Sequence, residues 1–94
     1  MMFDTTTKLL RKVIESSKLY GLPIAIITEA EEFLTYNEQV LCLEHILTQL
    51  YENDIKIDSA FYELVQTIAQ KMSIAEGDYS YIKELIRGNN KSAQ

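Results

Sequence analysis

The sequence predicts an all-α protein, a small antiparallel bundle of four to five helices, and three observations support this. Apolar residues recur with the period of an amphipathic helix in successive segments. Residues that end or begin helices, such as Gly21 and Pro23, lie between those segments. The connections are short, which favours antiparallel neighbours. With 94 residues, 47% of them apolar, we expect a single domain over residues 1–94, in which residues 89–94 form a frayed tail.

The first two predicted helices are separated by Gly21 and Pro23. A cap from Asp4 or from one of the threonines at 5–7 begins the first helix, and Gly21 ends it. Pro23 begins the second, over about 23–35, where its missing N–H costs no hydrogen bond. The apolar face of the first helix holds Leu9, Leu10, Val13, Ile14 and Tyr20, and that of the second holds Ile26, Ile27, Ala30, Phe33 and Leu34.

A third helix is predicted to begin at the Tyr36-Asn37-Glu38 joint, with Asn37 as its N-cap. Its apolar seam advances by four and three residues in alternation, as in a helix packed between neighbours along its length. The seam consists of Tyr36, Val40, Leu43, Leu47 and Leu50, and Tyr51 widens it. The outward face carries Glu38, Leu41, His45 and Glu52, with Cys42 nearby.

Residues 53–56 are predicted to form a turn before the fourth helix, over 59–72. Asp58 is expected to cap this helix, with Ile57 and Tyr62 as a hydrophobic staple around the cap. Its apolar side holds Phe61, Leu64, Val65, Ile68 and Met72. After a connection at 73–77, Asp78 is expected to cap a last short helix that Gly88 ends. That helix carries Tyr79, Tyr81, Ile82, Leu85 and Ile86.

Acidic residues are concentrated in the middle third of the chain. The formal net charge is −5 at pH 7. Residues 29–63 hold nine acidic residues against Lys56 alone (−8), whereas residues 1–28 hold two against four basic (+2) and residues 64–94 three against four (+1). A surface of this sign repels nucleic acid and anionic membranes and attracts a basic protein. A solvated face that only maintains solubility is the alternative.

The apolar runs, the single cysteine and histidine, and the glycines indicate the cellular compartment and which kinds of catalytic or metal site to expect. No apolar run approaches the roughly 20 residues of a membrane span, and Cys42 has no second cysteine, so we expect a reducing, cytoplasmic location. One Cys and one His do not make a zinc site, and each glycine is explained by a helix end rather than by a phosphate loop. Cys42 and His45 could form a nucleophile and base, but acidic surroundings raise a thiol pKa. We therefore expect no catalytic residue, no metal and no cofactor.

Two alternative functions remain open from the sequence. Asp58-Ser59-Ala60 resembles the Asp-Ser-Leu of acyl carrier proteins, whose serine takes a phosphopantetheine arm, although helix capping explains Asp58 and Ser59 without it. Leu41 and the tyrosines could instead form the surface of a homodimer, which would make the chain a self-associating structural or regulatory module.

The stretch 33–65, FLTYNEQVLCLEHILTQLYENDIKIDSAFYELV, resembles the central pattern of the MafI-type immunity proteins of bacterial polymorphic toxin systems. The resemblance covers about residues 22–72, and the Tyr-Asn-Glu joint and Glu44 are its most informative part. Cys42 stands where the pattern has a small Ala. The pattern is carried by Glu31, Phe33, Leu34, Tyr36, Asn37, Glu38, Leu41, Leu43, Glu44, Leu47, Leu50, Ile57 and Tyr62.

The resemblance implies a small helical protein that binds and neutralises a co-encoded toxin, often a nuclease of the EndoU or a related ribonuclease kind. The charge distribution independently favours a basic protein partner, because an acidic helical face can cover the basic cleft of a nuclease. We therefore predict an immunity protein that acts by stoichiometric inhibition, with Leu41 as an apolar anchor. The predicted partner-binding residues are Glu29, Glu32, Glu38, Leu41, His45, Glu52 and Asp54.

Overall fold

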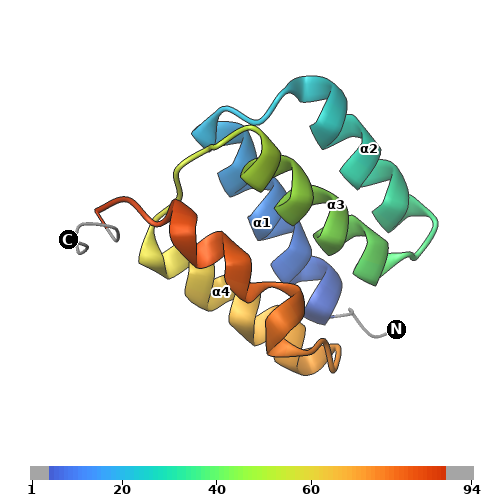
Figure 1. The fold of residues 1–94 in the computed structure, drawn as a ribbon. Helices are drawn as coiled ribbons and strands as arrows, with labels where there is room; N and C mark the ends of the chain where they lie inside the picture. The colour runs from blue at the N-terminus through green and yellow to red at the C-terminus, as the bar shows by residue number, and fades with distance from the viewer. Residues whose placement is uncertain (1–4, 89–94) are drawn as a thin grey trace.

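The computed structural model describes residues 5–88, which form a small all-α bundle, as predicted (Figure 1). Each α-helix runs antiparallel to the one before it (Figure 1). The expected tail at 89–94 and the alternative cap at Asp4 lie outside the described residues. The elements are α1 (Thr5–Tyr20), α2 (Ile24–Thr35), α3 (Gln39–Glu52), α4 (Ser59–Lys71) and two 3-10 segments, η1 (Glu76–Asp78) and η2 (Ser80–Leu85).

α1 is the central helix, since it contacts α2, α3 and α4, and α2 packs most extensively on α3. The apolar faces predicted for α1, α2 and α4 are all buried or half-buried, which confirms those assignments. Fully burying one large aliphatic side chain contributes about 1.5–3 kcal/mol. The largest fully buried side chains are Leu10, Val13, Ile14, Ile27, Leu43, Ile46, Leu47, Leu50, Ile57, Val65, Ile68 and Ile82.

All four α-helices end in the same way, with a residue in the left-handed backbone region. These residues are Gly21 (φ 102°), Asn37 (φ 60°), Asp54 (φ 50°) and Ser73 (φ 58°). After each, the next N–H donates to the carbonyl five residues back, at 2.8–3.0 Å, which closes the last helical turn. Asn37 therefore ends α2, and its predicted role as the N-cap of α3 is wrong. α3 follows Glu38, whose side chain makes no capping hydrogen bond.

The buried face of α3 is rotated from the predicted seam. Leu43, Leu47 and Leu50 are buried as predicted, but Tyr36 is 74% exposed and Val40 is 40% exposed. At about 100° per residue, the observed buried sector is centred roughly 50° from the predicted one. Cys42 and Ile46 are in the sector, and Val40 falls at its edge. Tyr36 does not belong to α3 at all, because it is the C-cap residue of α2.

The start of α4 follows the prediction closely. The Oδ1 atom of Asp58 accepts a hydrogen bond from the N–H of Phe61 at 2.8 Å, which is the expected N-cap. Ile57 and Tyr62, the expected staple, are both buried in the core. Among the described helices, none has both the length and the apolar character that crossing a membrane requires.

The C-terminal segment differs from the predicted last helix. Asp78 lies inside η1 rather than capping a helix, and η2 is a 3-10 segment that ends at Leu85, before Gly88. Directly after η2 the backbone is extended, and Ile86 forms an isolated parallel β-bridge with Ile57. The N–H of Ile57 donates to the carbonyl of Leu85 at 2.9 Å, and the N–H of Arg87 donates to the carbonyl of Ile57 at 2.8 Å. This bridge ties the segment to the turn before α4.

Candidate functional site

An open groove of about 390 Å³ lies along α2 and α3. Positions 29, 32, 33 and 36 share one face of α2 and its C-terminal end because they are three or four residues apart. The structure therefore brings together four of the predicted site residues, Glu29, Glu32, Glu38 and His45, and adds two aromatic residues to them. The groove is lined by Glu29, Glu32, Phe33, Tyr36, Glu38 and His45.

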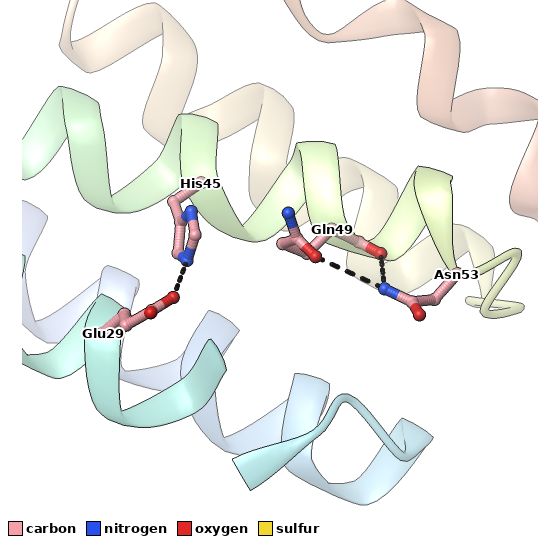
Figure 2. A network of polar contacts seen from close by, with 4 residues as sticks. All are labelled: Glu29, His45, Gln49 and Asn53. Carbon is pink, nitrogen blue, oxygen red and sulfur yellow. Dashed lines mark hydrogen bonds and ion pairs between the residues drawn. The ribbon is translucent and has the colours of Figure 1, made fainter. Parts of the chain in front are cut away.

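His45 is held against α2 by two contacts. Its Nε2 atom lies 2.7 Å from Oε1 of Glu29, a contact that is drawn as a dashed line in Figure 2. Its ring meets the ring of Phe33 edge-to-face, with centroids 5.7 Å apart and planes at 68°. The His45 side chain is 24% exposed, so the imidazole forms part of the groove wall while remaining accessible. The contact with Glu29 is an ion pair only when the imidazole is protonated.

Further along α3, polar side chains follow His45 at intervals of four residues (Figure 2). The side-chain amide of Asn53 donates to the carbonyl of Gln49 at 2.8 Å and lies 3.4 Å from Oε1 of Gln49. The same carbonyl also accepts the backbone N–H of Asn53 at 3.0 Å, so the Asn53 side chain adds a second donor at the end of α3. Gln49 and Asn53 therefore serve the end of the helix and do not line the groove.

Leu41 lies beside the groove, in an adjoining hollow of about 260 Å³ that it shares with Phe33, Glu44, His45 and Thr48. It is 46% exposed, as the prediction of an outward apolar anchor requires. With Tyr36 and Val40 it makes up an exposed apolar set at the start of α3. Tyr36 and Val40 were not among the predicted site residues because both were predicted to lie in the buried seam of the third helix. Recognising Asn37 as the left-handed end of α2 would have taken Tyr36 out of the predicted α3 seam.

Glu52 and Asp54 are not brought to the groove and line neither hollow. Glu52 ends α3, 14 residues after Glu38, so the helix rise of 1.5 Å per residue separates them by about 20 Å. The Oδ1 atom of Asp54 pairs with Nζ of Lys56 at 3.2 Å, and both side chains are largely exposed. Such an exposed pair contributes little to stability. These two carboxylates extend the acidic surface rather than the groove.

Cys42 is fully buried, and burial raises the pKa of its thiol to about 11. At neutral pH the thiol is therefore protonated and out of contact with solvent, the opposite of an activated nucleophile. Within residues 5–88, no group of three His, Cys, Asp or Glu side chains is arranged to hold a metal ion. Asp58 uses its carboxylate to cap α4, and Ser59 beside it is exposed.

A third hollow, of about 490 Å³, lies between α1 and α4, and it was not predicted from the sequence. The rings of Tyr20 and Phe61 meet edge-to-face within it, with centroids 5.4 Å apart. Burial raises the pKa of Tyr20. Arg11 and Lys12 line the hollow together with Glu15 and Asp58. Because charges of both signs meet there, the hollow favours no single class of ligand.

Comparisons with protein-family models, with curated proteins and with solved structures identify no similar protein. The chemistry of the described residues and the resemblance of residues 33–65 are therefore the basis on which a function can be proposed. The α2–α3 groove combines acidic side chains with aromatic surface, whereas the hollow between α1 and α4 carries charges of both signs.

Proposed function

We propose that this protein is an immunity protein that binds and neutralises a bacterial toxin domain through the α2–α3 face. The observation that carries the proposal is the convergence of Glu29, Glu32 and Glu38 on a groove that contains exposed aromatic surface. Carboxylates at the rim attract a basic partner and accelerate association, whereas desolvated aromatic and aliphatic groups supply most of the affinity. The α2–α3 face offers both.

The proposed partner is a basic nuclease domain, most simply a ribonuclease. Nucleases present basic clefts to a polyanionic substrate, and a cluster of carboxylates can occupy or cover such a cleft. The inhibition is stoichiometric and non-catalytic, since blocking the cleft requires only a stable complex. The resemblance of the Tyr36-Asn37-Glu38 joint and Glu44 to the immunity-protein pattern supports the same class of partner.

The experiment is co-expression of this chain with the toxin domain encoded by the neighbouring open reading frame. Growth should be restored, and the two proteins should elute together from a sizing column at a one-to-one ratio. Glu32→Gln with Glu38→Gln should weaken protection, whereas Glu63→Gln with Glu76→Gln, which changes the net charge equally elsewhere, should not. Growth arrest without any complex would contradict the proposal.

A second candidate function is self-association, and the exposed apolar set of Tyr36, Val40 and Leu41 favours it. A patch of this kind marks an interaction surface, which could be that of a second copy. Sedimentation velocity of the isolated chain separates the candidates. If the chain is a dimer and Leu41→Ser dissociates it, self-association is favoured. If the chain is a monomer at all concentrations, the apolar set is the binding surface for a different protein.

A further inference from the structure

The α2–α3 groove has an apolar interior with a charged rim. Phe33 is half-buried and forms part of its wall, whereas Tyr36 is 74% exposed at its end. A tyrosine gives a large amphipathic surface and loses only two rotatable bonds when a partner covers it. The lining of the groove is therefore suited to a side chain that is itself flat or long and partly apolar.

The rim lacks a cation that would complement its charge. Within residues 5–88, neither Glu32 nor Glu38 forms an ion pair, and Glu29 contacts only the imidazole of His45. A cation entering the groove would meet Glu32 on α2 and Glu38 at the start of α3, two carboxylates that form no ion pair within residues 5–88. Because Phe33 and Tyr36 line the same groove, the cation meets aromatic surface as well as carboxylate oxygens.

We propose that this groove takes a single arginine side chain of a partner protein, stacked on Tyr36 and hydrogen-bonded to Glu32 and Glu38. A guanidinium is planar, stacks on aromatic faces, and presents N–H groups in a fork that matches carboxylates. A lysine ammonium fits less well, because it is compact, strongly hydrated and cannot stack. The Glu29–His45 contact positions the wall between α2 and α3 without taking part. The identity of the arginine donor as a toxin rests on the proposed function, but the chemistry of the groove does not.

The test uses three short peptides as probes, acetyl-Gly-Xaa-Gly-amide with arginine, lysine or citrulline at the middle position. Each is titrated into the isotopically labelled protein while amide and side-chain NMR signals are followed. The arginine peptide should shift the signals of Phe33, Tyr36 and Glu38 saturably, with weak affinity. The citrulline peptide, which keeps the shape but lacks the charge, should shift them little, and the lysine peptide should fall between the two.

Variants of the protein test whether the peptide binds at this groove or is attracted only by the overall negative charge. Tyr36→Ala should weaken arginine-peptide binding about fivefold, and Glu32→Gln by a similar factor. Glu63→Gln on α4 removes the same charge elsewhere and should leave binding unchanged. Equal binding of the arginine and citrulline peptides, or equal effects of Glu32→Gln and Glu63→Gln, would overturn the proposal. If Tyr36→Ala leaves the affinity for the toxin domain unchanged, the arginine site is overturned but the proposed function is not. If the arginine peptide binds as expected but no toxin complex forms, the proposed function is overturned but the arginine site is not.

Discussion

Glu29 of α2 and His45 of α3 are joined across the helical hairpin by a 2.7 Å contact between Oε1 and Nε2 (Figure 2). The two residues are 16 positions apart, and the Phe33 ring meets the imidazole edge-to-face. The contact therefore fixes one wall of the groove. It also explains why His45, although on the outward face of α3, is only 24% exposed.

Replacing His45 should cost more stability than replacing Glu29. His45→Ala loses the edge-to-face contact with Phe33, and we expect a loss of about 1 kcal/mol. Glu29→Ala removes a carboxylate that is 55% exposed, and its loss should stay below about 0.5 kcal/mol. Urea unfolding of both variants and of the double variant measures the coupling. Equal losses would mean that the carboxylate, not the aromatic ring, holds the imidazole.

Ser17→Ala should leave stability unchanged or raise it by about 1 kcal/mol. The hydroxyl of Ser17 is completely buried in α1 and has no hydrogen-bond partner among the described residues. Removing an unpaired buried polar group relieves its desolvation cost, and alanine favours the helix. The neighbouring Ser16→Ala, at a half-buried position, is the control for helix propensity. A loss above 1 kcal/mol in Ser17→Ala alone would show that the hydroxyl has a partner.

Stability should fall above pH 9 because of Cys42. Burial raises the pKa of its thiol from 9.0 to about 11, so between these values the unfolded chain loses a proton that the folded chain keeps. The stabilisation is complete below pH 9 and is lost as pH rises to about 11, by roughly 2–3 kcal/mol. Burial also raises the pKa of Tyr20 and Tyr62, so Cys42→Ala, which retains the tyrosines, is the control. Identical alkaline profiles for both proteins would contradict the assignment.

The left-handed helix ends predict opposite effects for two glycine substitutions. Ser73→Gly should raise stability by about 0.5–1 kcal/mol, because glycine adopts the positive φ of 58° without steric cost. Gly21→Ala should lower it by about 1 kcal/mol through the backbone alone, since no atom lies within 4 Å of the added Cβ. Gly77→Ala, in equally open space without a positive φ, should have little effect. Thermal unfolding of the three variants measures the differences.

Helix positions and caps that depend on nearby residues were largely predictable from the sequence. Structure that depends on contacts between residues far apart in the chain was not. Apolar periodicity located α1, α2 and α4 to within a residue or two at each described end, and Asp58 identified the start of α4. The role of Asn37 was wrong because its preference for N-caps competes with its tolerance of the left-handed region, and only the backbone of α2 decides between them. The Ile57–Ile86 bridge, which directly follows η2, joins residues 29 positions apart, and no local pattern encodes it.

The candidate site likewise contains some residues that were predicted from the sequence and others that were not. Glu29, Glu32, Glu38 and His45 meet because antiparallel helices bring the end of one beside the start of the next. Glu52 was chosen for its charge and lies a helix length away. Phe33 and Tyr36 were assigned to the core by their apolar character, although Tyr36 is the most exposed residue of the groove's aromatic surface.

The central claim is that the acidic α2–α3 face, rather than acidity in general, binds the partner. The most direct measurement is the association rate with the co-encoded toxin domain, by stopped-flow at low and high salt. Glu32→Gln with Glu38→Gln should slow association about tenfold at low salt and less at high salt, while Glu63→Gln with Glu76→Gln changes it little. An equal effect of the two pairs, or none from the first, would contradict the claim.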